Sequence, residues 1–202
     1  MMKTMEYTAS KPLSMRFGVY KTTAIASKPL LQRMTDLLAY KEKYPDFELP
    51  WYSLAEAGLF FSIFFCASQC NALILSNTDD WVHFVKTLPT ASSPSGAPPQ
   101  LTTAELDELS MILTRIEKIA DHAQKLNVPV LIDAEQTYYQ KAIHFFAKAL
   151  MKRYNREKPI IYNTYQMYLR DSLDTLEKHI KECEKANIHF GAKVCHAVVK
   201  VI

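Results

Sequence analysis

Glycine and cysteine are scarce in this sequence of 202 residues, and its net charge is small. Four glycines leave little room for the glycine-rich loops that wrap phosphate groups, so a phosphate-binding barrel enzyme is a weak hypothesis. Four cysteines are too few for a disulfide scaffold and favour reduced thiols in an intracellular compartment. The net charge of +3 comes without a block of Lys or Arg, so no nucleic-acid partner is expected. With 49% hydrophobic residues, the chain can bury a sizeable core.

The middle of the chain, residues 45–100, shows no regular periodicity. It contains an apolar run from Leu59 to Leu75, but polar residues at 69–71 interrupt this run without charged flanks, which disfavours a membrane-spanning helix. Thr90 to Gln100 is rich in Pro, Ser and Gly, which predicts a mobile linker that stays outside the core. We therefore expect an irregular helical or loop insertion and linker over residues 45–100.

Residues 1–44 are predicted to form one strand and one helix. Phe17 to Ala26 is rich in aromatic and β-branched residues, which predicts a buried strand. Ser27 followed by Pro29 is typical of a helix start. Apolar residues at helical spacing then predict the buried face of that helix: Leu30, Leu31, Met34, Leu37 and Leu38.

Residues 101–202 are predicted to form three further units in which short apolar strands alternate with helices. Thr102 and Glu105 form a capping box, which predicts the start of a long amphipathic helix. The elements expected after it are a strand at 128–132, a helix at 142–154, a strand at 159–162, a helix at about 172–186 and a strand at 188–194.

The predicted strands recur at a regular interval. Asp133, Asn163 and Lys193 close three of them at steps of 30 residues, close to the roughly 31 residues per unit of a (β/α)8 barrel. A doubly wound sheet shares this period, but it would usually show a glycine-rich turn after its first strand. The fold class predicted is therefore α/β, a partial (β/α)8 barrel. In such barrels the carboxyl ends of the strands face the active site, which would bring five side chains to one rim: Lys21, Asp133, Asn163, Gln166 and Lys193.

Two alternatives remain open at the strand that ends near Ile132. Asp133 could pair with Lys21 or Lys193 across the rim, or Asp133 and Glu135 could cap the helix that follows.

The amide and tyrosine residues also allow two interpretations each. Asn163 and Gln166 could recognise the edge of a planar heterocycle, or could hold a turn. Ordinary packing is favoured over a stacking wall for an aromatic cofactor in the case of five tyrosines: Tyr138, Tyr139, Tyr162, Tyr165 and Tyr168.

No metal site is predicted. Cys66 and Cys70 lack the two-residue spacing of zinc ribbons, and the sequence has no second cysteine pair that would complete a zinc site. The cysteines are therefore interpreted as small apolar residues that fill the core. The histidines show no common ligand spacing and are expected at the surface or as hydrogen-bonded core residues.

Three blocks of sequence, in order and at matching spacing, resemble the proline dehydrogenase (proline oxidase) family of eukaryotic mitochondria. They are Val130 to Tyr138 (VLIDAEQTY), Pro159 to Leu169 (PIIYNTYQMYL) and His189 to Val194 (HFGAKV). Tyr20 to Ala24 (YKTTA) is similar to the family's lysine-bearing second strand. The resemblance covers roughly half of the chain.

The resemblance implies a distorted (β/α)8 barrel with FAD bound noncovalently at the carboxyl rim, of which this chain would hold about strands two to five. It also implies oxidation of L-proline to Δ1-pyrroline-5-carboxylate, by hydride transfer from proline C5 to flavin N5, with ubiquinone as the electron acceptor. Carried over by position, the implied roles are catalysis for Asp133 and Lys193, substrate binding for Lys21, and cofactor binding for Ala134, Gln166 and His196. His196 stands where the family has Arg or Lys, and Ala197 replaces a glycine.

The resemblance further implies a mitochondrial location with association at the inner membrane, although Met1 to Tyr20 shows no evident presequence. The alternative hypothesis is a catalytically inactive barrel fragment that acts by associating with another protein, or with itself, through its open sheet edges.

Overall fold

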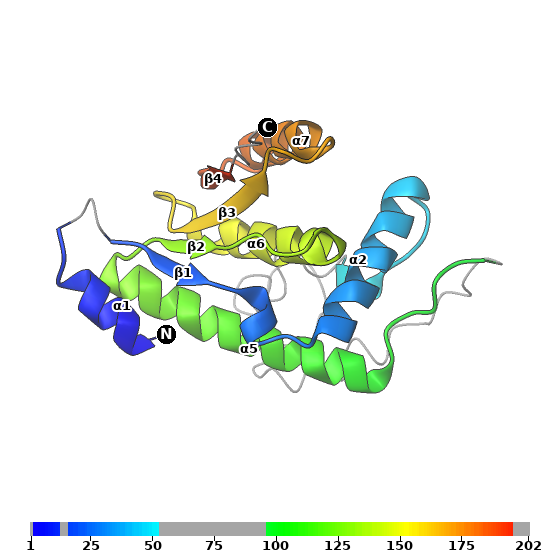
Figure 1. The fold of residues 1–202 in the computed structure, drawn as a ribbon, viewed down its shortest axis with the longest axis horizontal. Coiled ribbons are helices and arrows are strands. Elements are labelled where there is room, and N and C mark those ends of the chain that lie inside the picture. Colours follow the sequence, from blue (N-terminus) through cyan, green and yellow to red (C-terminus); the bar gives the residue numbers. More distant parts are fainter. Residues whose placement is uncertain (1, 13–15, 53–95, 196–202) are drawn as a thin grey trace, which may run out of the picture.

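A parallel sheet of four strands forms the centre of the molecule, in a computed structural model that describes residues 2–12, 16–52 and 96–195 (Figure 1). The strands follow chain order, as consecutive βα units require: β1 (Gly18–Tyr20), β2 (Val130–Ile132), β3 (Ile161–Gln166) and β4 (Ala192–Cys195). A doubly wound sheet would instead reverse its strand order at one point. The α/β class and the parallel sheet are therefore confirmed, and the sheet is consistent with part of a barrel.

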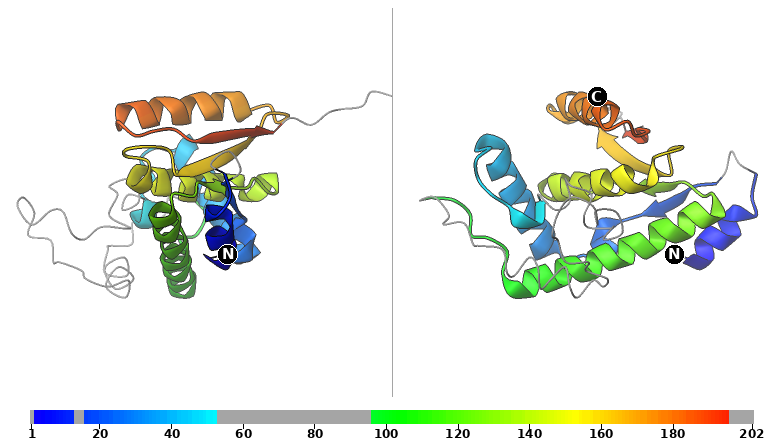
Figure 2. Two further views of the ribbon diagram at one scale, coloured as in Figure 1. Left: turned by 90° about the vertical axis from the view of Figure 1, so that its left-hand side faces the viewer. Right: turned by 180° about the vertical axis from the view of Figure 1, so that it is seen from behind.

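Five α-helices accompany the sheet in the described residues. They are α1 (Met2–Ala9), α2 (Lys28–Lys43), α5 (Thr103–Leu126), α6 (Gln140–Tyr154) and α7 (Ser172–Lys185). Two short 3-10 helices, η2 (Thr22–Ala24) and η3 (Thr137–Tyr139), follow β1 and β2. Figure 2 shows α7 beside β4 and α5 extending as the longest helix of the molecule.

The predicted helix starts are confirmed. Ser27 caps α2, with its hydroxyl accepting a hydrogen bond from the Leu30 N–H at 3.4 Å. The capping box of α5 is complete, because Thr102 Oγ1 accepts from the Glu105 N–H while the Glu105 carboxylate accepts from the Thr102 N–H. Asn127, with φ of 54°, ends α5 in the left-handed conformation that asparagine tolerates.

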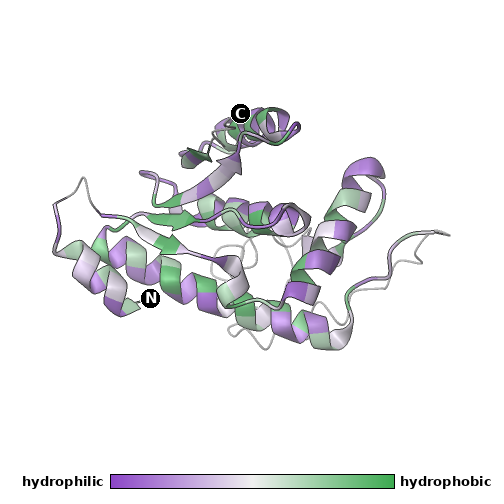
Figure 3. Ribbon diagram, viewed as in Figure 1, coloured by the Kyte–Doolittle hydropathy of each residue, from purple (hydrophilic) through white to green (hydrophobic). Residues whose placement is uncertain are grey.

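The core lies between α2, α5, α6 and the sheet. The five leucine and methionine side chains predicted for the buried face of α2 are all buried. Most apolar residues of α5 at helical spacing are buried as well, and Leu106, Ile119 and Leu126 are partly buried. Figure 3 shows this as an alternation of hydrophobic and hydrophilic residues along α5. Trp51 and Phe146 are among the largest fully buried side chains, and Cys183 fills the same core, as predicted for a buried thiol.

The strand predicted over Phe17 to Ala26 is wrong beyond its first residues. The chain is extended only through β1, and then turns through η2 towards α2. β3, in contrast, is longer at its carboxyl end than predicted, since it continues to Gln166, four residues past its predicted end. In each case a contact distant in sequence, η2 with the loop after β2 and β3 with β4, determines where the strand stops.

Gly191 shows why β4 can pair closely with β3. A Cβ atom at this position would lie 2.3 Å from the Ile161 carbonyl oxygen, which is a backbone atom that cannot move aside. The Gly191 carbonyl in turn accepts a hydrogen bond from the Asn163 N–H at 3.0 Å. Only glycine fits this approach.

The last part of the predicted linker does not behave as a mobile segment. The Arg33 guanidinium donates hydrogen bonds to the carbonyls of Pro99 and Gln100, and Ala97 packs against the core. The prediction that this linker stays outside the core is therefore wrong for residues 96–100. At the other end of the insertion, Phe47, Leu49 and Trp51 are buried in the core. The Leu59 to Leu75 run and its cysteines lie outside the described residues.

None of the described helices is both long enough and apolar enough to cross a membrane. The division of the chain into residues 1–44, 45–100 and 101–202 stays a prediction.

Candidate active site

The register of the strands places three site residues predicted from the sequence, together with one threonine, in a single row across the sheet. Tyr20 pairs with Ile132, and Ile132 pairs with Asn163. One residue further along each strand, the row contains Lys21, Asp133, Thr164 and Lys193, and Thr164 pairs directly with Lys193. Because side chains alternate between the faces of a sheet, this second row faces away from the side to which Tyr20, Ile132 and Asn163 point.

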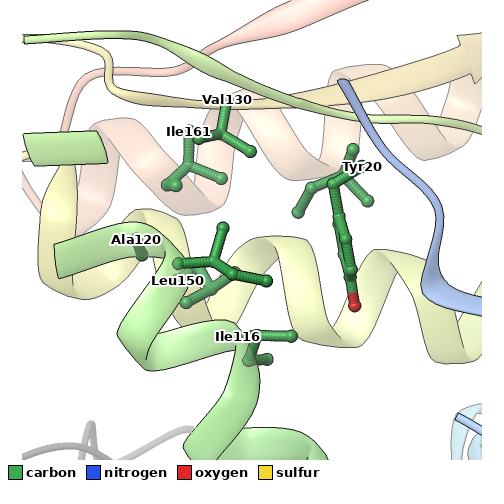
Figure 4. A pocket seen from close by; sticks show the side chains of 8 residues that line it. Tyr20, Ile116, Ala120, Val130, Leu150 and Ile161 are labelled. Atoms are coloured by element: carbon green, nitrogen blue, oxygen red, sulfur yellow. The ribbon is translucent and has the colours of Figure 1, made fainter. Parts of the chain in front are cut away.

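The face with Tyr20 and Ile132 is the helix-covered face. Figure 4 shows Tyr20, Val130 and Ile161 from the sheet meeting Ile116 and Ala120 of α5 and Leu150 of α6 around a small apolar cavity. Tyr20 carries the one polar side-chain group among the lining residues, and the cavity lies on the opposite face from Asp133. The candidate site is therefore on the other face, at the carboxyl ends of the strands, and that face is the open one.

The central feature of the open face is an ion pair between Lys193 Nζ and Asp133 Oδ1 at 3.6 Å. The two side chains are 42% and 25% exposed, so a ligand could reach both. Asp133 is also fixed through its backbone, since its N–H donates to the Tyr20 carbonyl at 2.9 Å. Of the two interpretations left open for Asp133, pairing with a lysine is confirmed, and capping of the next helix is wrong, because α6 has no side-chain cap.

Lys21 lies in the same row, beyond the end of β1, with an exposed side chain. It forms no ion pair within residues 2–12, 16–52 and 96–195, so its ammonium group is available to a ligand. The backbone at Lys21 is extended, with φ of −108° and ψ of 126°, and η2 begins at the next residue. The structure thus brings Lys21, Asp133 and Lys193 to one edge of the sheet, as the sequence predicts.

Asn163 does not belong to this rim. Its side chain is 1% exposed and faces α6, with Nδ2 lying 2.7 Å from His144 Nδ1. Asn163 and Gln166 are three residues apart on one strand, so they must point to opposite faces. Thr164 takes the rim position, and its hydroxyl donates to the Ile132 carbonyl at 2.8 Å. This alternation within β3 was the available signal for Thr164, which the sequence reasoning missed.

Two histidines form hydrogen bonds on the helix-covered face, as expected for core histidines. Tyr165 Oη lies 2.9 Å from His179 Nδ1, and the His144 ring stacks on Tyr165. Burial disfavours the imidazolium form and lowers the pKa of His144 to about 4, and it lowers the pKa of His179 further. Both rings are therefore neutral near pH 7 and hold β3 against α6 and α7.

Gln166 is at the carboxyl end of β3, and its side-chain Nε2 donates to the Glu135 carbonyl at 3.0 Å and to Tyr168 Oη at 2.6 Å. Its Oε1 is buried and has no hydrogen-bond partner among the described residues. A ligand N–H that donates a hydrogen bond to this oxygen would be stabilising, since a buried acceptor without a partner is unfavourable. Ala134, the other described cofactor candidate, is half-buried in the loop after β2.

The five tyrosines do not form one stacking wall. Tyr139 and Tyr165 are buried, Tyr162 meets Phe17 edge to face, and Tyr138 and Tyr168 are about half exposed. Packing, the interpretation favoured from the sequence, is confirmed for the two buried rings. His196 lies outside the described residues.

Glu135 makes contacts that the sequence reasoning did not anticipate. Its carboxylate accepts hydrogen bonds from the N–H and the hydroxyl of Thr23, 112 residues away in the chain. No local pattern could have revealed a contact of this range. The described residues hold no group of His, Cys, Asp and Glu side chains that could bind a metal ion.

Comparison with known proteins agrees with the resemblance. The family model described as proline dehydrogenase matches residues 1–196. The chain is 35% identical to proline dehydrogenase 1, mitochondrial, of Arabidopsis thaliana over 196 residues, which are 95% of this chain and 34% of the relative. It is 41% identical to the Dictyostelium discoideum protein of the same name over 108 residues (52% and 19%), and 35% identical to the human protein of that name over 126 residues (61% and 21%).

The chain thus spans about a third of the plant relative's length, and less of the other two. No solved structure gave a significant match. The family match over nearly all of the chain, together with the strand-end residues described above, leads to one conclusion: the chain belongs to the proline dehydrogenase family.

Proposed function

We propose that this chain forms the part of a proline dehydrogenase active site in which L-proline meets a bound FAD. The observation that carries the proposal is the Asp133–Lys193 ion pair on the open face of the sheet, in register with Lys21. The reaction is the oxidation of L-proline to Δ1-pyrroline-5-carboxylate, with the electrons passing to ubiquinone. Relatives named as mitochondrial proline dehydrogenases support this reaction and a mitochondrial location.

The described residues fit a flavin. The buried Oε1 of Gln166, which has no partner within residues 2–12, 16–52 and 96–195, can accept a hydrogen bond from a ring N–H, and Lys193 supplies a partly exposed positive charge at the same edge of the sheet. Together with Ala134 and His196, Gln166 would hold the cofactor. When bound, the flavin supplies a hydride acceptor, chemistry that amino-acid side chains lack.

The residues of the chain have separate tasks in this proposal. Lys21, whose side chain is exposed and has no ionic partner in the described part of the chain, binds the substrate, most directly through the substrate's carboxylate. Asp133 fixes the Lys193 ammonium in place through the ion pair. Lys193 would supply a positive charge beside the bound cofactor that favours its reduction, because a charge set in position before the reaction needs no reorganisation.

The sheet supports a place for this chain within a (β/α)8 barrel, as about strands two to five. The strands are parallel and in chain order, and β1 and β4 each have one side without a partner strand among the described residues. The helix-facing rows are packed, whereas Phe17 and Val19 on the other face are 47% and 56% exposed. Such an apolar inner face would be covered by further strands of a closed barrel. Inner-membrane association belongs to the same proposal, through the use of ubiquinone.

The proposal is tested by the visible spectrum of the purified chain with FAD, without oxygen, before and after addition of L-proline. We expect flavin absorption bands that bleach with L-proline and not with D-proline, and a Lys193→Met variant that bleaches more slowly. A chain that binds no FAD, or a bound flavin that L-proline leaves oxidised, would overturn the proposal.

A second candidate function is supported by the exposed edges and the exposed Phe17 and Val19. A catalytically inactive chain could associate through these surfaces with another copy or another barrel protein. Sedimentation analysis distinguishes the two candidates, since a flavin-free oligomer supports this one.

A further inference from the structure

Glu135 links three separate parts of the candidate site. Its Oε1 accepts from the Thr23 N–H at 3.0 Å, and its Oε2 accepts from the Thr23 hydroxyl at 2.5 Å. Its carbonyl accepts from Gln166 Nε2 at 3.0 Å, and its own N–H donates to Gln140 Oε1 at 3.3 Å. One residue thus joins the end of β1, the end of β3 and the start of α6.

Thr23 matters because of where it lies in the chain. It is the middle residue of η2, two residues after Lys21, and η2 is only three residues long. A 3-10 helix this short has little stability of its own. The two hydrogen bonds to a carboxylate therefore hold the turn that directs Lys21 out of β1, and charged acceptors make such bonds stronger than neutral ones.

The arrangement also shows what Glu135 does not do. Both of its carboxylate oxygens already accept hydrogen bonds from Thr23, whereas Asp133 faces Lys193, and Gln166 Oε1 has no partner where the structure is described. A residue engaged in this way acts on a ligand only through its neighbours.

We propose that Glu135 is the positioning residue of this site, which fixes the backbone at Lys21 relative to Asp133 and Gln166. Asp133 precedes Glu135 by two residues in the same loop. The loop after β2 therefore contacts Lys193 through Asp133 and the segment next to Lys21 through Glu135. The effect on a ligand rests on the proposed function, but the effect on the backbone at Lys21 does not.

The chain contains a matched control for this proposal. Glu108 of α5 holds Ser27 in the same manner, with Oε1 accepting from the Ser27 N–H at 2.7 Å and Oε2 accepting from its hydroxyl at 3.0 Å. Ser27 lies on the same connection between β1 and α2, but six residues from Lys21 rather than two. Glu108→Gln therefore removes an equivalent clamp without touching the site.

The first experiment measures amide hydrogen exchange at single residues in the full chain carrying Glu135→Gln or Glu108→Gln. We expect exchange at Thr23 to accelerate about tenfold in Glu135→Gln, the factor for one weakened charged hydrogen bond, and to stay at the wild-type rate in Glu108→Gln. Amides in the middle of α5 and α6 should keep their protection, which separates a local release from general destabilisation. An unchanged Thr23 amide in Glu135→Gln, or equal acceleration in both variants, would overturn the proposal.

The second experiment measures oxidation of L-proline by the same variants with FAD present. Glu135→Gln should raise KM for L-proline about tenfold with kcat within about twofold of wild type, and Glu108→Gln should leave both unchanged. Equal KM values in the two variants would contradict the positioning role. If the wild-type chain itself does not oxidise L-proline, the proposed function fails, while the Thr23 exchange rates still decide whether Glu135 positions Lys21.

Discussion

The two faces of the sheet differ in how their polar groups are used. On the helix-covered face, Asn163 contacts His144 and Tyr165 contacts His179, and burial holds the pKa values of both histidines below the neutral range. On the open face, Lys21 has no ionic partner among the described residues, and Gln166 Oε1 is unpaired there as well. One strand, β3, contributes to both. Its residues alternate between the packed face and the face on which we propose the active site.

The largest effect expected from this contrast concerns apolar truncation. Ile132 is fully buried against the helices, and Ile132→Ala should lower the free energy of unfolding by about 2–5 kcal/mol. Val19, 56% exposed on the other face, should lose less than about 1 kcal/mol on Val19→Ala. Urea denaturation of both variants measures the difference. Similar losses would show that the two faces are covered alike.

Acid should destabilise the helix-covered face. His144 has a pKa of about 4 in the folded chain against about 6.5 when unfolded, so below pH 6.5 the unfolded chain binds a proton that the folded chain excludes. The free energy of unfolding should therefore fall by about 3 kcal/mol between pH 6.5 and pH 4. His179, whose pKa is also lowered, changes stability in the same direction.

The measurement is chemical denaturation at several pH values, for the wild type and for His144→Gln. The variant should lose part of the slope between pH 6.5 and pH 4. An identical slope in the variant would assign the acid sensitivity to other groups.

A smaller effect is expected at Thr164, which is buried in the row between Asp133 and Lys193. Thr164→Val keeps the shape but removes the hydrogen bond to the Ile132 carbonyl, which should cost about 1 kcal/mol. Thermal unfolding followed by circular dichroism checks this value. No loss of stability would mean that the hydroxyl does not help to hold β3 against β2.

Removal of the Asp133–Lys193 ion pair is expected to have the smallest effect on stability and the largest effect on function. Asp133→Asn should change the free energy of unfolding by less than about 1 kcal/mol, because a partly exposed ion pair contributes little. The same variant should reduce flavin bleaching by L-proline, since Lys193 loses the group that fixes it. Paired denaturation and spectral measurements separate the two effects. A variant that loses several kcal/mol of stability but, while folded, bleaches flavin at the wild-type rate would reverse the assignment.

Local patterns predicted much of this fold. The capping box at Thr102 and the Ser27 helix start could be predicted because the N–H groups that these two side chains cap lie three residues further along the chain. The parallel strands followed from their period and apolar character, and placing the strand ends at one edge gave the Asp133–Lys193 pair as one of the alternatives that stayed open.

Distant contacts account for what the sequence did not predict. The strand through Ala26 was expected from β propensity, but the Glu135 carboxylate, more than a hundred residues away, holds Thr23 in η2. Arg33 likewise draws residues 99 and 100 against the body of the protein. Asn163 is a different case, because strand alternation alone would have assigned it to the helix-covered face.

The central claim is that the open face, through Gln166 and its neighbours, is where a flavin binds. Its most direct test is a titration of the full chain with FAD, followed by flavin fluorescence, for the wild type, Gln166→Leu and the Glu108→Gln control. The account predicts saturable binding that Gln166→Leu weakens about tenfold and Glu108→Gln leaves unchanged. Absence of saturable binding, or equal affinity in all three proteins, would contradict it.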